Sequence, residues 1–289
     1  MALSNFFITG STGFLGRNLL KILSEEKWNI VAPKRNELFT LLSQQGNIDL
    51  IIHAAGKAHS TKNTESESDE FFEVNLELTR RITNRIDEQG LELNTFVFIS
   101  TVAVYGLDEG VNINENSPLM GRSPYAASKI RAEEHLQSWS KEKGINLVIL
   151  RLPLIFGENA PGNLGAMEKA IRSRYYFQIG DGSARRSIVN VKELCEFIPS
   201  LLGKSGVYNI TSKEHPSYSE IGYYFGKKHN RKINKIPLDL LKIVAFCGDI
   251  IPKFPLNSYR LSKLTQTLTF DDTQARKDIG WKGRNVLEL

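Results

Sequence analysis

An apolar run that leads directly into three glycines is the feature that most restricts the fold of this chain. Residues 6–16 read FFITGSTGFLG, and a helical pattern follows at once. Glycine lets the backbone turn sharply and approach a pyrophosphate, and a new helix offers that anion free N–H groups and the positive end of its dipole. The spacing G-x-x-G-x-x-G alone also fits a structural tight turn. Its place at a strand–helix junction favours dinucleotide binding by Gly10, Gly13 and Gly16.

Short apolar runs alternate with helical patterns through the first half of the chain. The runs LIIHAA and FVFIS lack polar alternation, as do strands that are buried on both faces. This order predicts an α/β fold, a Rossmann-type doubly wound parallel sheet with a smaller C-terminal substrate lobe. Strands are expected at residues 5–9, 29–32, 49–53, 95–100, 146–152, 187–191 and 207–210, and helices from the glycine turn to about residue 25, at 70–88 and at 125–141.

The regular alternation of strand and helix patterns ends at Pro153, after which glycine and proline become frequent. We predict a dinucleotide-binding domain at residues 1–152 and an interleaved substrate-binding lobe at residues 153–289, with the strand near 207–210 returning to the sheet. The polar stretch at 60–70 is expected to be an exposed loop.

The apolar stretch at 238–251 is too short to span a bilayer, and it contains charged residues. We expect a buried amphipathic helix there, and a helix on a lipid surface is the alternative.

Charge and cysteine content narrow the function classes. The net charge is +5, but Lys and Arg are scattered along the chain, which favours an anionic small ligand over a nucleic acid. Cys195 and Cys247 lie far apart and show no metal-ligand spacing, so we expect no metal site and a reducing compartment, the cytoplasm. The segment MALSNFFITG resembles a first strand and not a signal peptide.

A Thr–Tyr–Lys set is the candidate catalytic group. Tyr125 and Lys129 are four residues apart in SPYAASK, so a helix places them on one face. An ammonium near a phenol lowers the phenol pKa and suits acid–base catalysis. Ser100 and Thr101 end the strand at 95–100, at the sheet edge where ligands bind, and Thr101 is expected to hydrogen-bond a substrate oxygen. Each residue alone also fits a structural role.

Together these motifs resemble a known family. GSTGFLG, HAAG, the Asn75 of VNL, STVAVYG, YAASK and RLPLIFG are similar, in order and spacing, to the extended short-chain dehydrogenases/reductases of the NAD-dependent epimerase/dehydratase family, which act on nucleotide sugars. GDGSARRSIVNV and DDTQARKDIGW extend the resemblance nearly to residue 289.

The resemblance implies a role for each motif residue. Tyr125 is the general acid/base, Lys129 is its partner, and Thr101 is the catalytic hydroxyl. Substrate contacts are implied for Ser100, Arg186 and Arg260. The cofactor is expected to contact Gly10, Thr12, Gly13, Phe14, Leu15, Gly16, Ala54, Ala55, Gly56, Lys129, Pro153 and Leu154. Members of the family commonly form dimers through two helices, here at about 70–89 and 125–141, so a homodimer is expected.

The tip of the second strand bears on the choice of dinucleotide. An NAD enzyme has an acidic side chain there to bind the ribose 2′-hydroxyl. This chain reads IVAPKRNEL, and Lys34 and Arg35 suit the 2′-phosphate of NADP instead. Glu37 is expected to belong to the next helix. NADP is therefore the expected cofactor, and NAD is the alternative.

Three functions remain open. NADP and a brief second crossover at 33–48 favour NADPH-dependent reduction of a 4-keto-6-deoxy nucleotide sugar, a polysaccharide precursor. A UDP-hexose or UDP-N-acetylhexosamine 4-epimerase is the alternative reaction. The resemblance argues against a dehydratase, because Val102 and Ala103 replace the Asp–Glu pair of those enzymes. A non-catalytic NADP sensor that binds a partner protein is the alternative of another class, although such relatives usually lose the Tyr or Lys retained here.

Overall fold

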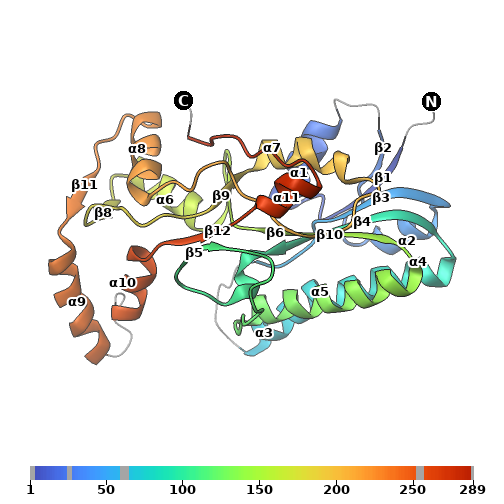
Figure 1. Cartoon of the computed structure of the whole chain (residues 1–289), viewed down its shortest axis with the longest axis horizontal. Helices are drawn as coiled ribbons and strands as arrows, with labels where there is room; N and C mark the ends of the chain where they lie inside the picture. The colour runs from blue at the N-terminus through green and yellow to red at the C-terminus, as the bar shows by residue number, and fades with distance from the viewer. Residues whose placement is uncertain (1–3, 25–27, 59–64, 252–256, 288–289) are drawn as a thin grey trace.

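A parallel sheet forms the centre of the molecule (Figure 1). The structure is a computed structural model that describes residues 4–24, 28–58, 65–251 and 257–287. Within these residues the sheet has six strands in the order β10-β6-β4-β3-β1-β2, and each neighbouring pair is parallel. The strands are β1 (Asn5–Thr9), β2 (Asn29–Val31), β3 (Asn47–His53), β4 (Glu92–Thr101), β6 (Asn146–Leu152) and β10 (Gly206–Asn209). The predicted Rossmann-type α/β fold is confirmed.

Helices cover both faces of this sheet, α1, α7 and α11 above it and α4 and α5 below it in Figure 1. Two apolar cores result, one around Leu19 and Leu194 and the other around Ile82 and Leu136. The helices are α1 (Phe14–Leu23), α2 (Leu38–Ser43), α3 (Glu65–Phe72), α4 (Leu78–Gln89), α5 (Pro124–Lys143), α7 (Val191–Phe197) and α11 (Thr273–Asp278).

The strand order reverses at β1, which has β2 on one side and β3 on the other. In open α/β sheets this switch point opens a crevice at the carboxyl ends of the strands, and ligands bind there. The glycine turn follows β1, and Ala54–Gly56 follow β3, so the chain order itself places both predicted cofactor segments at the crevice.

The remaining elements build a second layer beside the sheet, at the left of Figure 1. Small parallel pairs join β7 to β9, β8 to β11 and β5 to β12. A third apolar core around Phe156, Leu164 and Phe225 holds this part together. Its elements are β5 (Gly110–Ile113), β7 (Leu154–Phe156), α6 (Gly162–Arg172), β8 (Phe177–Ile179), β9 (Ile188–Asn190), α8 (Tyr218–Lys228), β11 (Asn234–Ile236), α9 (Leu238–Ile250), α10 (Ser258–Thr265) and β12 (Leu268–Phe270).

Two expectations about local structure are wrong. Within the stretch expected to be a loop, residues 65–70 are helical and belong to α3, whereas residues 60–64 lie outside the described ranges. Helix α9 is not buried, because its large apolar side chains find no core to cover them and only Ala245 is buried. None of the helices in the described ranges combines the length and apolar character that a membrane span requires.

The predicted dimer stays a prediction. The strongly exposed large apolar side chains of the described residues lie outside α4 and α5, which carry half-buried apolar residues such as Leu78 and Ile130.

A buried ion pair links α5 to β6 under the crevice. The guanidinium of Arg151 lies 2.7 Å from the carboxylate of Glu133, and the two side chains are 4% and 1% exposed. Arg151 also donates to the hydroxyl of Tyr105 at 3.0 Å, and this hydroxyl donates to Asn209 at 2.8 Å. The network therefore connects the helix that carries Tyr125 with the last two strands of the sheet.

Replacing one partner tests how much this network contributes to stability. Arg151→Met leaves the Glu133 carboxylate buried without its cation, and we expect a loss of about 3–5 kcal/mol in the free energy of unfolding. Arg131→Met on the same helix is the matched control, because its pair with Glu134 is exposed and contributes below about 1 kcal/mol. Urea unfolding of both variants measures the difference, and equal losses would contradict the assignment.

Candidate active site

The glycine turn has no room for side chains at two of its three glycines. Gly10 has φ +72°, and a Cβ built on it would lie 2.5 Å from the backbone nitrogen of Ala55. A Cβ on Gly16 would lie 2.1 Å from the carbonyl oxygen of Gly10. The turn is therefore pressed against the segment that follows β3 and against the first turn of α1.

The end of α1 in this turn is open to an anion. Gly13 is the N-cap residue of α1 and supplies no side-chain cap. The first N–H groups of the helix therefore remain available to donate hydrogen bonds to a ligand, and the helix dipole adds positive potential there. A Cβ on Gly13 would meet the carbonyl oxygen of Gly10 at 3.2 Å, and one on Gly56 would meet the amide oxygen of Asn75 at 3.1 Å. This side-chain-free cradle fits the pyrophosphate of a dinucleotide.

The predicted cations at the tip of β2 lie beside the turn. Ser11 donates its hydroxyl to the carbonyl oxygen of Pro33 at 2.9 Å and so ties the turn to the segment that follows β2. Lys34 and Arg35 come next, and both side chains are exposed. The carboxylate of Glu37 accepts a hydrogen bond from the backbone N–H of Lys34 at 3.2 Å. Glu37 directly precedes α2, so this contact lies within the loop between β2 and α2.

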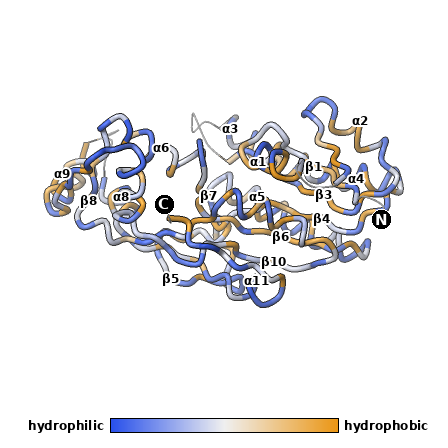
Figure 2. The backbone as a smooth tube through the Cα atoms, turned by 90° about the horizontal axis from the view of Figure 1, so that it is seen from above, coloured by the Kyte–Doolittle hydropathy of each residue, from blue (hydrophilic) through white to orange (hydrophobic). Residues whose placement is uncertain are grey.

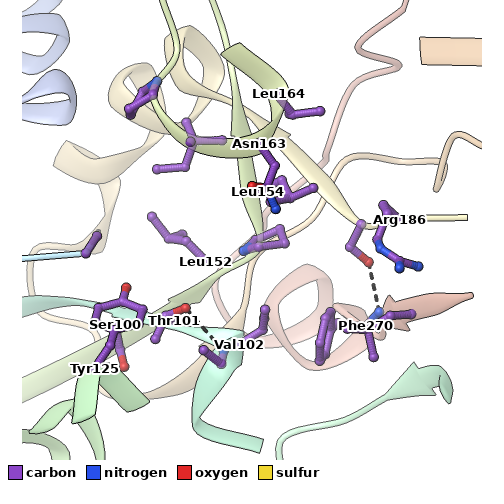
Figure 3. Close-up of a pocket in the computed structure, with 18 of the residues that line it drawn as sticks. Ser100, Thr101, Val102, Tyr125, Leu152, Leu154, Asn163, Leu164, Arg186 and Phe270 are labelled. Carbon is purple, nitrogen blue, oxygen red and sulfur yellow. Dashed lines mark hydrogen bonds between the residues drawn. The ribbon is translucent and has the colours of Figure 1, made fainter. Parts of the chain in front are cut away.

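A cavity of about 740 Å³ runs from the crevice toward the second layer. Figure 3 shows Thr101 and Tyr125 on one side of it and Arg186 on the other. Lys34 and Arg35 lie outside it, at the tip of β2, and Gly10, Thr12, Gly13, Phe14, Gly16 and Ala55 lie in the cofactor segments without lining it. The predicted site residues that line the cavity are Leu15, Ala54, Gly56, Ser100, Thr101, Tyr125, Lys129, Pro153, Leu154, Arg186 and Arg260.

Tyr125 begins α5, and Thr101 ends β4 beside it. The Thr101 hydroxyl accepts the backbone N–H of Ala103 at 3.2 Å and lies near the phenol of Tyr125. Burial raises the pKa of Tyr125, and the neighbouring Thr101 hydroxyl offsets only part of that rise. Our expectation of a lowered pKa is wrong for the protein alone, because loss of water outweighs the neighbouring groups. Tyr125 therefore holds its proton at neutral pH.

Lys129 lies one turn further along α5 and is buried. Its ammonium donates to the carbonyl oxygen of Ile99 at 2.8 Å and lies 4.4 Å from the centre of the Phe98 ring. Burial lowers the pKa of Lys129 to about 8, and the Glu133 carboxylate opposes this shift. The side chain also borders Gly56, because a Cβ built on that glycine would lie 3.2 Å from the Lys129 ammonium.

The two neighbouring hydroxyls of β4 differ in their partners. Ser100 donates to the buried carboxylate of Glu133, whereas Thr101 contacts Tyr125. Ser100 thus belongs to the Arg151 network, although it also borders the cavity.

Arg186 is a cavity residue and not a surface charge. It is 8% exposed, and its guanidinium donates to the carbonyl oxygen of Gln266 and lies 5.2 Å from the Tyr218 ring. These contacts hold the cation at the cavity wall. Arg260 lies on α10 at the rim of the same cavity and is more exposed.

Two asparagines of the site had no role assigned from the sequence: Asn75 is quoted above only as part of the family resemblance, and Asn163 was not singled out. Asn75 lies in a π-helical turn between α3 and α4, accepts the backbone N–H of Lys57 at 2.9 Å and donates to the hydroxyl of Ser128 at 2.9 Å. It thereby joins the loop after β3 to the helix of Tyr125. Asn163 enters the cavity from the start of α6 (Figure 3). The π-helical turn leaves no sequence signal, whereas an Asn after Pro-Gly at a helix start was a usable hint.

Comparison with known proteins agrees with this geometry. The profile of the NAD dependent epimerase/dehydratase family matches residues 6–211. The chain is 26% identical to the N-acetyl-alpha-D-glucosaminyl-diphospho-ditrans,octacis-undecaprenol 4-epimerase of Escherichia coli O157:H7, over 93% of this chain and 88% of the relative.

Solved structures share the fold. RMD from Pseudomonas aeruginosa, complexed with NADPH, superposes with a TM-score of 0.73 at 20% identity, covering 98% of this chain and 95% of the other. UDP-glucuronic acid 4-epimerase from Bacillus cereus, in complex with NAD, gives a TM-score of 0.76 at 18% identity, covering 98% and 92%.

The protein is thus an NAD(P)-dependent enzyme with a short-chain dehydrogenase/reductase fold, and it belongs to the NAD dependent epimerase/dehydratase family.

Titration of Lys129 makes a testable contribution to stability. The pKa of the Lys129 ammonium is about 8 in the folded protein and about 10.5 in the unfolded chain. Between these two pH values the unfolded state binds more protons than the folded state, so the free energy of unfolding rises with pH. Relative to Lys129→Met, cofactor-free wild-type protein is expected to gain up to about 3 kcal/mol between pH 8 and 10.5, and nothing below pH 8. Urea unfolding across this range measures the gain. A difference between the two proteins that does not change with pH would show that Lys129 is not buried as a cation.

Proposed function

We propose that this enzyme uses NADPH to reduce a 4-keto-6-deoxy nucleotide sugar. The observation that carries the proposal is the cationic pair Lys34 and Arg35, exposed beside the glycine turn where an NAD enzyme places an acid. The bond from Ser11 to Pro33 keeps this pair next to the cofactor cradle. A 2′-phosphate supplies the anion that such a pair binds best. NADP is released and replaced in a reductase, whereas an epimerase retains its cofactor.

The chain's own residues provide acid catalysis for such a reduction. The bound cofactor would supply the hydride. Tyr125 holds its proton at neutral pH and donates it to the alkoxide oxygen that forms from the ketone. Thr101 hydrogen-bonds the same oxygen and orients it beside the phenol. Lys129, one turn further along the same helix and partly deprotonated only near pH 8, would favour the phenolate that Tyr125 becomes and would bind ribose hydroxyls of the cofactor.

The far side of the cavity suits the diphosphate of a nucleotide sugar. Arg186 lies opposite Tyr125 (Figure 3). Arg260 also lines the cavity, so two cations are available for the part of the substrate beyond the sugar. Asn163 adds an amide between the two sides. The substrate would lie across the cavity with its sugar at Tyr125 and its diphosphate at Arg186.

Dehydration does not fit this wall of the cavity. Val102 and Ala103 line it directly after Thr101, in a short helical turn, and neither side chain can move a proton.

An epimerase is the second candidate, because the Escherichia coli relative is named a 4-epimerase and the same Tyr125 and Thr101 could serve it. The experiment is to identify the dinucleotide that copurifies and to incubate the enzyme with a UDP-4-keto-6-deoxyhexose and NADPH. Loss of the NADPH absorbance band supports reduction, and retained NAD with interconversion of UDP-hexoses overturns it.

Removing the phenolic proton tests the acid. Tyr125→Phe is expected to lower kcat for NADPH oxidation by about 10²–10⁴-fold, because the alkoxide loses its proton donor. The dissociation constant for NADPH, measured by fluorescence titration, stays unchanged. The exposed tyrosine of α8 supplies the control variant Tyr223→Phe, for which wild-type kcat is expected. A Tyr125→Phe enzyme with full activity would rule out this mechanism.

Removing the cations at the tip of β2 tests cofactor choice. Lys34→Ala combined with Arg35→Ala is expected to weaken NADPH binding by about tenfold or more, since charge-assisted contacts to the 2′-phosphate are lost. NADH binding should change little. Lys21→Ala, exposed in the last turn of α1, controls for a general loss of positive charge. Equal weakening of NADPH and NADH would contradict the assigned 2′-phosphate site.

A further inference from the structure

The large apolar side chains of α9 face solvent along one line of the helix. The exposed fractions are 54% for Leu240, 65% for Ile243, 65% for Phe246 and 68% for Ile250. They are separated by three or four residues, so they form a continuous stripe. We call these four residues the α9 stripe. A single exposed apolar side chain is ordinary, whereas a contiguous stripe marks an interaction surface.

Positive charge is concentrated in the segments around this stripe. Residues 227–251 and 257–263 contain eight Lys and Arg and two Asp, a net charge of +6, whereas the whole chain carries +5. The remainder of the protein is therefore close to neutral. Two of the cations in these segments, Lys228 and Lys263, pair with Glu168 and Asp108 of other elements, so the excess rests on the others. Lys232 and Lys235 are exposed in the segment that leads directly into α9. Asp239, at the start of α9, is paired with Lys242 at 3.0 Å.

We propose that α9 is an interfacial helix that lies on the surface of an anionic phospholipid bilayer. The α9 stripe enters the boundary between headgroups and acyl chains, and the neighbouring Lys side chains contact lipid phosphates. Bulky apolar side chains on one face and basic residues next to them characterise helices of this kind. With 13 residues, α9 lies in the plane of the surface and does not cross the bilayer.

Charge favours a bilayer over a second copy of this chain. A two-fold contact between two α9 stripes would bring two segments of net charge +6 together, and like charges across an interface are unfavourable. An anionic lipid surface has the complementary sign.

The position of α9 also suits this occupant. Figure 2 shows α9 as an apolar segment at the end of the molecule opposite the strands of the central sheet, next to hydrophilic segments. It packs against α10, whose Lys263 and Leu264 line the cavity. Docking through α9 thus leaves the cofactor cradle in water and holds the substrate cavity one helix away from the lipid.

Flotation with unilamellar vesicles tests the proposal. Wild-type protein is expected to bind vesicles of equal parts phosphatidylglycerol and phosphatidylcholine and to be released by high salt, and to bind phosphatidylcholine vesicles poorly. Ile243→Glu combined with Phe246→Glu is expected to weaken binding by about a hundredfold. The control is Val111→Glu, an equally exposed apolar side chain on β5, with wild-type binding.

A second pair of variants tests the charge. Lys232→Gln with Lys235→Gln should weaken vesicle binding by about tenfold, whereas Lys141→Gln with Lys204→Gln, both exposed and outside this segment, should not. In Phe246→Trp, brominated lipids are expected to quench the new fluorescence, which reports insertion independently of affinity.

Three outcomes would overturn the proposal. The first is that wild-type protein shows no preference for phosphatidylglycerol vesicles. The second is that the stripe variant, Ile243→Glu with Phe246→Glu, binds vesicles as well as wild type. The third is that wild-type protein forms a dimer without lipid and that the stripe variant is a monomer, which would assign α9 to self-association. The stripe variant should retain wild-type NADPH turnover in vesicle-free solution, because Ile243 and Phe246 lie outside the cavity. Vesicle binding is measured without substrate, so failure of the proposed reaction and failure of lipid binding are separate results.

Discussion

The close approach of Gly10 to the backbone of Ala54 and Ala55 is the constraint on which the rest of the site depends. A Cβ at Gly10 would lie within 2.7 Å of three backbone atoms there, so any side chain would force the ends of β1 and β3 apart. Thr9 and His53 join these strand ends through a 2.6 Å hydrogen bond, and burial, followed by the Lys129 ammonium, lowers the pKa of His53 to about 3. A neutral, buried imidazole thus supports the contact that places the glycine turn against Ala54 and Ala55, directly before the Gly56 that borders Lys129.

The sequence predicts this half of the site because its signals are local. Three local patterns each fix the geometry of a few residues: a strand that runs into glycines, a Tyr and a Lys four residues apart on a helix, and a hydroxyl at a strand end. The parallel order of the strands then brings these residues to one edge of the sheet. Properties that depend on the surroundings were not predictable in this way. Burial decided the direction of the Tyr125 pKa shift, and a buried carboxylate 33 residues away engaged the hydroxyl of Ser100. Apolar content suggested a buried α9, but among the described residues its outer side chains Leu240, Ile243, Phe246 and Ile250 stay exposed.

Reductases and epimerases of this family can share one set of catalytic groups, so the reaction has to be inferred from what surrounds that set. In the proposed function Tyr125 is the acid, and Val102 and Ala103 stand where an elimination would need proton-transferring side chains. In the proposed function, Lys34 and Arg35 select NADPH, and an exchangeable NADPH delivers its hydride once instead of taking it back. The two halves of the proposal are thus separate, because the catalytic set supports hydride transfer at a sugar carbon and the cations at β2 support an exchangeable NADPH.

The most direct test of this account follows the hydride itself. The enzyme is incubated with NADPH that carries deuterium at the transferable position of the nicotinamide and with a UDP-4-keto-6-deoxyhexose, and the sugar product is analysed by mass spectrometry and NMR. The account predicts one deuterium at C4 of the sugar for each NADP formed. An unchanged 4-keto sugar, with NAD still bound to the enzyme and without consumption of NADPH, would contradict it.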